Sequence, residues 1–244
     1  MISRRAMLAA LLPPGAVTVA LRVSDDAVLA CSEEMRARRV LAAPGSAVKP
    51  LVLAAMTQRG AAHCGRRLVV AGRRLDCTHT VLAGDVDAET ALAASCNCWF
   101  ALRARAMDPA VLHGALLRAG AEARLAQTPD ELALQALGVE GVRFTPMALA
   151  EAYRGLAGSR DALLRGGLER AVREGTAQLA GIDGLTVAGK TGTSREGAWF
   201  AGFAPAQAAR VVVTAYVPGG RGGADAAPAA RAIFEWWQRS AHSR

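Results

Sequence analysis

Segments with the pattern of β-strands lie at both ends of this chain of 244 residues, and helical patterns fill the part between them. Residues 16–23 and 27–31, joined by three polar residues, predict a β-hairpin near the start. Residues 185–193, 198–203 and 210–217 predict three further strands near the end. We therefore expect an α/β protein of the α+β type, with a central antiparallel sheet built from both chain ends and flanked by helices.

Helix start and stop signals are clear between the two groups of strands. Apolar residues recur at helical spacing over residues 46–59, and Gly60 predicts the end of that helix. Proline at the first helical position, directly after a capping residue, predicts further helices that begin at Pro109, Pro129 and Pro146.

One domain is expected over residues 16–244, closed by a helix over 226–239, because no linker or repeat interrupts it. Residues 1–15 are expected to be a short signal-like or anchor-like segment. Arg4 and Arg5 precede a short apolar stretch there, which is typical of a twin-arginine export signal. No run free of charge and proline reaches about 18 residues, so we expect no uninterrupted membrane-spanning helix.

The charge balance is strongly basic, with 29 lysine and arginine residues against 21 acidic ones and a net charge of +8. A nucleic-acid-binding surface would combine clustered basic residues with aromatic ones. Here the arginines are scattered, and the chain has two Tyr and five Phe. We therefore expect no nucleic-acid partner and interpret the charge as a solvated basic surface, suited to anionic polymers of the cell envelope.

Lysine is nearly absent from this basic chain. Lys49 and Lys190 are the two lysines, and the other 27 basic residues are arginine. Guanidinium supplies a solvated positive charge as well as ammonium does, but only an amine loses its proton near neutral pH. The two lysines are therefore candidates for chemistry, and each of them lies in a short motif.

Ser46 and Lys49 form an S-x-x-K motif at the start of the first predicted helix. One helical turn separates them, so both side chains are expected on the same face. The positive end of the helix dipole and burial both disfavour the ammonium form, which would leave a neutral amine able to take the proton of Ser46. An ordinary helix start is the alternative interpretation, because this motif is common by chance.

Ser95 and Asn97 form a second motif, S-x-N. A hydroxyl and an amide two residues apart can lie on one face of a cleft, where the hydroxyl relays a proton and the amide binds a substrate amide. A helix cap is the alternative interpretation, because Ser and Asn are common capping residues.

The third motif is K-T-G at Lys190, Thr191 and Gly192, followed by Thr193 on a predicted strand. Alternation places Lys190 and Gly192 on one face of the strand and Thr191 on the other. The glycine permits close approach of another backbone, so an extended substrate can lie along this edge, with its carboxylate near the lysine and the hydroxyls. A phosphate-binding loop is excluded, because that motif needs a loop that enters a helix.

Together and in this order, the three motifs resemble those of the penicillin-binding protein transpeptidase domain and its serine β-lactamase relatives. The resemblance extends over nearly the whole chain from residue 16 onward. It includes residues 91–100, 145–150, 174–177, 198–205 and 222–228. It implies the fold of that superfamily, and the short interval between the second and third motifs implies a reduced all-helical subdomain.

The resemblance also implies a role for each motif residue. Ser46 is the nucleophile that becomes acylated, Lys49 is its general base, and Ser95 passes the proton to the leaving amine. The backbone N–H groups of Ser46 and Thr193 form the oxyanion hole. Trp199 is expected in the core rather than at the border of the cleft.

The remaining motif residues are implied to bind the substrate. Asn97 holds its peptide group, and Lys190 supplies positive potential and supports the proton-relaying serine. Thr191, Gly192 and Thr193 contact the terminal carboxylate.

The implied activity is that of a serine D,D-transpeptidase or D,D-carboxypeptidase that acts on peptidoglycan stem peptides ending in D-Ala-D-Ala. Such an enzyme forms an acyl-enzyme, binds penicillin and other β-lactams covalently, and needs no cofactor. The implied location is the cell envelope, in the periplasm or on the extracytoplasmic face of the inner membrane. Membrane association and partner proteins of cell-wall synthesis are left open.

Two other functions are weighed. A β-lactamase would need a group that speeds deacylation, but Glu122, Glu131 and Glu140 do not lie in the glutamate loop of that branch. A non-catalytic sensor of β-lactams or muropeptides, or a binding module of a cell-wall assembly, is the alternative outside enzymes.

Five cysteines leave at least one outside any intramolecular pair. Cys64 and Cys77 flank a short basic strand pair, and a disulfide could close that loop in an exported protein. His63 and His79 lie beside them, so a Cys/His zinc site is an alternative, but the spacing fits no common zinc module. We therefore expect a disulfide or plain thiols here, and no metal.

Overall fold

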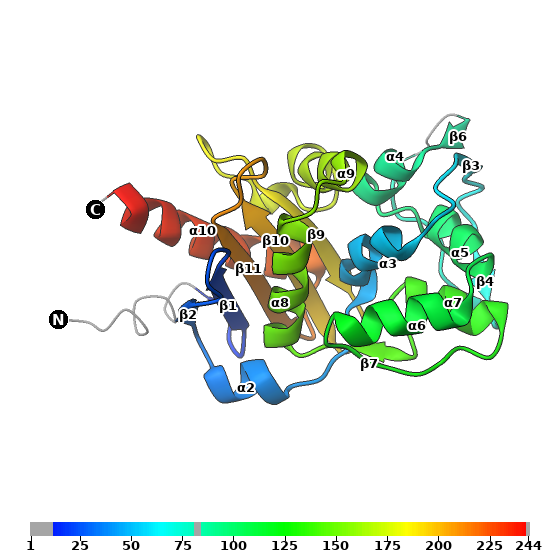
Figure 1. The fold of residues 1–244 in the computed structure, drawn as a ribbon, viewed down its shortest axis with the longest axis horizontal. Helices are drawn as coiled ribbons and strands as arrows, with labels where there is room; N and C mark the ends of the chain where they lie inside the picture. The colour runs from blue at the N-terminus through cyan, green and yellow to red at the C-terminus, as the bar shows by residue number, and fades with distance from the viewer. Residues whose placement is uncertain (1–11, 81–83, 243–244) are drawn as a thin grey trace.

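The computed structural model describes residues 12–80 and 84–242 and is built around one antiparallel sheet (Figure 1). Its five strands follow the order β2-β1-β11-β10-β9. They are β1 (Val17–Arg22), β2 (Val28–Cys31), β9 (Ala188–Thr193), β10 (Gly197–Ala204) and β11 (Val211–Pro218). β1 pairs with β11, so both chain ends build the sheet, and the predicted hairpin and the three later strands are confirmed.

Alternation along the strands divides their side chains between two hydrophobic cores, one on each face of the sheet. On one face, Phe200 packs against Phe234 of α10 (Ala227–His242), with ring centroids 6.2 Å apart. Trp199 points to the other face, which α8 (Pro146–Ala157) covers. The sheet is therefore the middle layer, with α10 and the short helical turns that contact it on one face and α8 on the other (Figure 1).

The segment between the two groups of strands holds most of the helices. Besides α8, they are α2 (Glu34–Arg39), α3 (Lys49–Ala55), α4 (Ala88–Ala93), α5 (Asn97–Arg105), α6 (Pro109–Arg118), α7 (Pro129–Ala136) and α9 (Ala162–Arg173). Short turns of helix are η1 (Gly45–Val48) and η2 (Gln178–Ala180) in this segment, and η3 (Gly222–Ala226) after β11. The helices predicted from Pro109, Pro129 and Pro146 are confirmed, each with a side-chain cap on the preceding residue.

Three two-stranded ribbons accompany these helices, so the subdomain is mainly rather than entirely helical. They pair β3 (Ala62–His63) with β6 (Asp85–Val86), β4 (Val69–Val70) with β5 (Arg73–Arg74), and β7 (Glu122–Ala123) with β8 (Val142–Arg143). The β4–β5 ribbon is the basic strand pair predicted between Cys64 and Cys77.

The helix predicted over 46–59 is shorter in the structure. It begins as a 3-10 turn, and α3 ends before Met56, whose backbone is extended (φ −77°, ψ 135°). Met56 is buried, and the chain turns away there toward α5, where the carbonyl of Gly60 accepts a hydrogen bond from Trp99 at 3.1 Å. Tertiary packing thus ends this helix earlier than the local pattern predicts.

No helix within residues 12–80 and 84–242 is both long and apolar enough to cross a membrane. The signal-like segment expected over residues 1–15 lies, up to residue 11, outside the described residues.

Candidate active site

The first two motifs meet at the side chain of Lys49, which is fully buried. Ser46 lies in η1, and the backbone N–H of Lys49, the first residue of α3, donates to its carbonyl. The Lys49 amine donates to Asn97 Oδ1 at 2.6 Å, to the Ser95 carbonyl at 2.9 Å and to Ser95 Oγ at 3.2 Å. The fold therefore brings together two motifs that are 46 to 48 residues apart in the sequence.

Burial changes the acidity of this amine. Removal from water lowers the pKa of Lys49 from 10.5 to about 8, although negative charge on nearby cysteine thiols opposes the shift. The Phe100 ring, whose centroid lies 5.2 Å from Nζ, is part of the apolar surroundings. With this pKa, a useful fraction of the amine is neutral near physiological pH, so Lys49 can accept a proton.

The second motif forms the turn that leads into α5. Ser95 has a φ of 57°, in the left-handed region, which costs a residue with a side chain roughly 1–2 kcal/mol. The side chain that caps α5 belongs to Cys96, and Asn97 instead donates to the carbonyls of Leu75 (3.1 Å) and Asp76 (3.4 Å). The helix-cap interpretation of Ser95 and Asn97 is therefore wrong, because both side chains contact Lys49.

Lys190 lies on β9 and is also fully buried. Its amine donates to Thr176 Oγ1 at 3.2 Å and to the carbonyl of Thr191 at 3.1 Å. Burial, and then the positive charge of Lys49, lower the pKa of Lys190 well below 10.5. Both lysines of the chain thus lie in one buried region, and K-T-G lies on a strand, as predicted.

Thr176 is a site residue to which the sequence motifs assign no role. Its hydroxyl lies 2.9 Å from Thr191 Oγ1 and also accepts the hydrogen bond from Lys190. Thr176 therefore joins the first two side chains of the K-T-G motif. Thr176 belongs to residues 174–177, one of the segments that resemble the family. That resemblance is the signal in the sequence that points to this residue.

Two glycines allow η1 and β9 to approach each other closely. Gly45 has a φ of 52°, and a Cβ built on it would lie 2.7 Å from the backbone nitrogen of Thr193. A Cβ on Gly192 would lie 2.7 Å from the backbone nitrogen of Ala47. Because neither position has room for a side chain, the backbones around Ser46 and Thr193 lie directly against each other.

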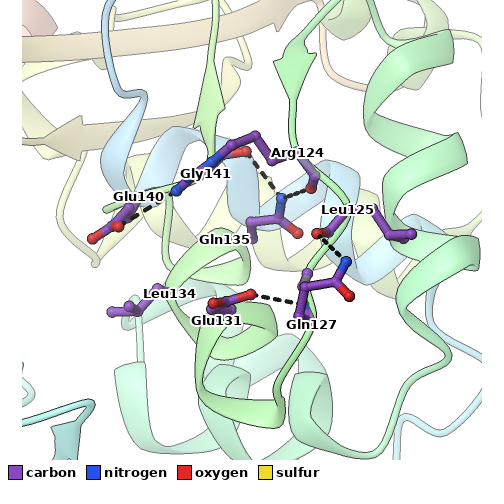
Figure 2. A pocket seen from close by; sticks show the side chains of 9 residues that line it. Arg124, Leu125, Gln127, Glu131, Leu134, Gln135, Glu140 and Gly141 are labelled. Atoms are coloured by element: carbon purple, nitrogen blue, oxygen red, sulfur yellow. Dashed lines mark hydrogen bonds and ion pairs between the residues drawn. The ribbon is translucent and has the colours of Figure 1, made fainter.

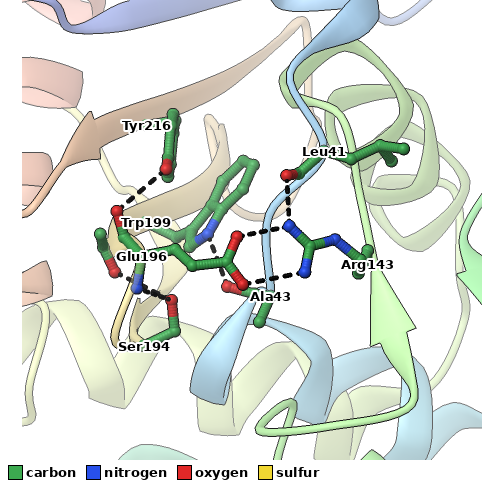
Figure 3. A network of polar contacts seen from close by, with 8 residues as sticks. Leu41, Ala43, Arg143, Ser194, Glu196, Trp199 and Tyr216 are labelled. Carbon is green, nitrogen blue, oxygen red and sulfur yellow. Dashed lines mark hydrogen bonds and ion pairs between the residues drawn. The ribbon is translucent and has the colours of Figure 1, made fainter.

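Trp199 holds the segment before Ser46 against the sheet. Its ring is fully buried and packs on Tyr216, with centroids 4.5 Å apart. Its indole nitrogen donates to the carbonyl of Ala43 at 3.0 Å (Figure 3). Trp199 is therefore a core residue, as predicted.

A polar network fastens the turn between β9 and β10 to the helical subdomain (Figure 3). Glu196 in that turn receives two hydrogen bonds from Arg143 of β8, at 3.0 and 2.5 Å. Arg143 also donates to the carbonyl of Leu41 at 2.7 Å, and Tyr216 donates to the carbonyl of Glu196 at 3.1 Å. These contacts hold the end of β9 beside the segment that carries Ser46.

Two of the three glutamates weighed for a β-lactamase have other contacts. Glu131 accepts a hydrogen bond from the backbone of Gln127 at 2.7 Å, and Glu140 forms an ion pair with Arg73 at 2.7 Å. Both glutamates line the pocket shown in Figure 2, whose lining contains none of the motif residues. Glu122 is exposed on β7. Within the described residues, no hydrogen bond or ion pair of these three glutamates involves Ser46.

Comparisons with known proteins agree with this fold. Residues 159–235 match the family model of the penicillin binding protein transpeptidase domain. No protein of curated function matches the chain in sequence.

Solved structures match nearly the full length. The D,D-transpeptidase domain of a peptidoglycan glycosyltransferase from Eggerthella lenta has a TM-score of 0.80 and 19% identity, over 98% of this chain and 81% of that one. Penicillin-binding protein A from M. tuberculosis, in an imipenem acyl-enzyme complex, has a TM-score of 0.73 and 21% identity, over 90% and 73%. The TP domain of Burkholderia pseudomallei penicillin-binding protein 3 has a TM-score of 0.79 and 21% identity, over 93% and 88%.

The chain therefore has the fold of the D,D-transpeptidase domains of penicillin-binding proteins. The part matched by the family model begins before α9 and includes β9 with its K-T-G motif, β10, β11 and much of α10.

Proposed function

We propose that this chain is a penicillin-binding serine acyltransferase that acts on D-Ala-D-Ala stem peptides of peptidoglycan through an acyl-enzyme at Ser46. The observation that carries the proposal is the set of hydrogen bonds from the buried Lys49 amine to Ser95 and Asn97. Lys190, the second buried amine, lies close enough for its pKa to be lowered by Lys49.

In the proposed reaction, Ser46 Oγ attacks the carbonyl carbon of the penultimate D-Ala while neutral Lys49 takes the hydroxyl proton. The bond to the nitrogen of the last D-Ala then breaks, and Ser95 passes a proton from Lys49 to that nitrogen. Free D-Ala leaves, and Ser46 carries the acyl group as an ester. Water, or the amine of a second stem peptide, then attacks the ester and releases the serine hydroxyl.

The position of β9 supports the binding of an extended peptide. β9 is an edge strand of the sheet, so a peptide can pair with its free side. Thr193 is exposed at the end of this strand, and Lys190 and Thr191 precede it, so a terminal carboxylate there would meet hydroxyls near positive charge. The N–H groups of Ser46 and Thr193 would stabilise the oxyanion.

This substrate sets the location and the inhibitors that we propose. Peptidoglycan stem peptides are cross-linked outside the cytoplasmic membrane, so the protein would act in the cell envelope. β-Lactams would acylate Ser46 as covalent inhibitors. Because Glu131 and Glu140 have other contacts and Glu122 is exposed on β7, we favour a slowly deacylating penicillin-binding enzyme over a β-lactamase.

Labelling with a fluorescent penicillin tests the proposal. The wild-type protein and a Ser240→Ala control, altered at an exposed serine of α10, should form a covalent adduct that persists for many minutes. Ser46→Ala should form none. Rapid release of the label would favour a β-lactamase, and a wild-type protein that forms no adduct would overturn the proposal.

A second assay separates the two forms of the reaction. Stem peptide is incubated with the protein, and D-Ala release is measured with and without an added amine acceptor. A carboxypeptidase releases D-Ala by hydrolysis alone, whereas a transpeptidase forms the new amide with the acceptor. Penicillin binding without D-Ala release would support a sensor instead.

A further inference from the structure

A group of thiols and one imidazole lies directly behind the second motif. Cys64, Cys77, His79 and Cys96 come from three separate segments, and their Sγ and imidazole nitrogen atoms all lie within 4.8 Å of one another. All three cysteines are buried, and the histidine is half-buried. The mechanism proposed above assigns no role to these four residues.

Three of the six distances among these atoms match the edges of a zinc tetrahedron, and all six are within 4.8 Å. Zn–S bonds of about 2.3 Å and Zn–N bonds of about 2.0–2.1 Å give S···S edges of about 3.8 Å and S···N edges of about 3.5 Å. In the structure, Cys77 Sγ lies 3.6 Å from Cys64 Sγ and 3.8 Å from Cys96 Sγ. Cys64 Sγ lies 3.6 Å from His79 Nε2. Three thiols and one imidazole are a common ligand set of structural zinc sites.

Hydrogen bonds prepare these groups to act as ligands. The backbone N–H of Cys98 donates to Cys77 Sγ at 3.4 Å, and that of Trp99 donates to Cys96 Sγ at 3.5 Å. Both N–H groups belong to the first turn of α5, whose positive dipole end favours thiolates.

The histidine has the matching tautomer. His79 Nδ1 lies 2.7 Å from the carbonyl of Thr80, which can only accept a hydrogen bond. Nδ1 therefore carries the proton, and the lone pair of Nε2 is directed toward the sulfur atoms. A backbone carbonyl bound to the second ring nitrogen is the usual support of a metal-binding histidine.

We propose that Cys64, Cys77, His79 and Cys96 bind one structural zinc ion. Binding would release the three thiol protons to solvent and would involve no oxidation or reduction. With four protein ligands, such a site is closed and holds the fold rather than reacting with substrate. This differs from the expectation of a disulfide or plain thiols, which rested on spacing in the sequence alone.

The zinc ion would act on the catalytic centre through Cys96. This residue stands between Ser95, with its left-handed backbone, and Asn97, and both of these contact Lys49. The loop that carries Cys77 also supplies carbonyls that hold the Asn97 amide. One ion would thus tie this loop to the start of α5 and fix the S-x-N turn.

Metal content tests the site independently of any activity. Full-length protein without a histidine tag is purified under reducing conditions with zinc supplied, and bound metal is measured by mass spectrometry after extensive dialysis. We expect one zinc ion per chain in the wild type and in the matched controls Cys31→Ser and His63→Ala. Cys64→Ser and His79→Ala should lose it. Zinc-free wild type, or variants that keep zinc as the controls do, would overturn the proposal.

Because loss of a structural metal can unfold a protein, wild-type protein provides a second measurement. After removal of zinc with a chelator, added Co²⁺ should produce the intense visible and thiolate charge-transfer absorption of a tetrahedral thiolate site. Added zinc should abolish these bands and restore the thermal unfolding temperature. A Cys64–Cys77 disulfide in protein isolated from the cell envelope, found by mass spectrometry without reduction, would also overturn the proposal.

Discussion

The amide oxygen of Asn97 lies 2.6 Å from the amine nitrogen of Lys49 and can only accept a hydrogen bond. The carbonyl of Ser95, at 2.9 Å, is a second pure acceptor on the same nitrogen. A neutral amine has two protons, so these two oxygens take both of them, and its lone pair then faces the hydroxyl of Ser95, whose Oγ lies 3.2 Å from the same nitrogen. The second motif therefore fixes the orientation of the Lys49 amine, as the proposed role of a proton acceptor requires.

Lys49→Arg should abolish acylation by penicillin. A guanidinium stays protonated at every working pH, so it cannot take the Ser46 proton. Loss of a general base lowers a rate by about 10²- to 10⁴-fold, and we expect a fall in this range or beyond. Stopped-flow or gel-based labelling measures the rate, and near-UV circular dichroism checks that the variant is folded. A folded variant that acylates at the wild-type rate would contradict the base role.

The acylation rate should rise with pH through about 8, the pKa to which burial lowers Lys49, and then level off. Below that pH the rate should fall about tenfold per unit, because protonated Lys49 has no lone pair. The charged groups that act on Lys49 are Lys190 and the thiols of Cys77, Cys96 and Cys98. The test is a pH profile of the acylation rate constant with one penicillin, and a rate that does not change between neutral and alkaline pH would argue against Lys49 as the base.

The lowered pKa of Lys49 also makes the free energy of unfolding depend on pH. The unfolded chain binds more protons at this site than the folded one between pH 8 and 10.5, so the contribution of Lys49 to stability falls as the pH falls through this window.

Gly192→Ala should weaken both stability and acylation. The new Cβ would lie 2.7 Å from the Ala47 nitrogen and would also meet the carbonyl of Pro44, so β9 must move away from η1. Overpacking of this kind costs about 1–3 kcal/mol. Chemical denaturation and the acylation rate give the two readouts.

Gly155→Ala is the matched control for that substitution. Gly155 lies inside α8, and nothing lies within 4 Å of a Cβ built there. The same change should therefore stabilise the protein by roughly 0.5–1 kcal/mol, since alanine favours a helix over glycine. If Gly192→Ala were as harmless as Gly155→Ala, the close approach of η1 and β9 would not matter for the site.

Thr176→Val should slow acylation by about fivefold, because the hydroxyl that joins Lys190 to Thr191 is lost and a hydrogen bond contributes about 1 kcal/mol. Thr176→Ser keeps the hydroxyl and should restore most of the rate. Comparison of the two variants separates the hydrogen bond from packing. Equal rates for valine and serine would leave Thr176 with a packing role alone.

Much of the fold follows from the sequence, because its signals are local. The hairpin at the start, the three strands near the end and the helices that begin at Pro109, Pro129 and Pro146 depend on alternation, turn residues and caps, and the structure has all of them. The end of the first helix at Met56 does not follow, because its cause is packing against distant residues. The candidate motifs were also found in the sequence, since each is a short pattern of neighbouring residues.

What only the tertiary structure decides is which of these residues meet. The three acceptors of Lys49 and the bridge that Thr176 makes between Lys190 and Thr191 join residues separated by 14 to 48 positions. The sulfur atoms of Cys64, Cys77 and Cys96 also meet only in the folded chain, because no regular spacing connects these residues in the sequence. The sequence by itself determines the local elements and the chemical groups available. The meeting of these groups around Lys49, and the grouping of three thiols with His79 behind them, depend on burial and long-range contacts that only the folded chain contains.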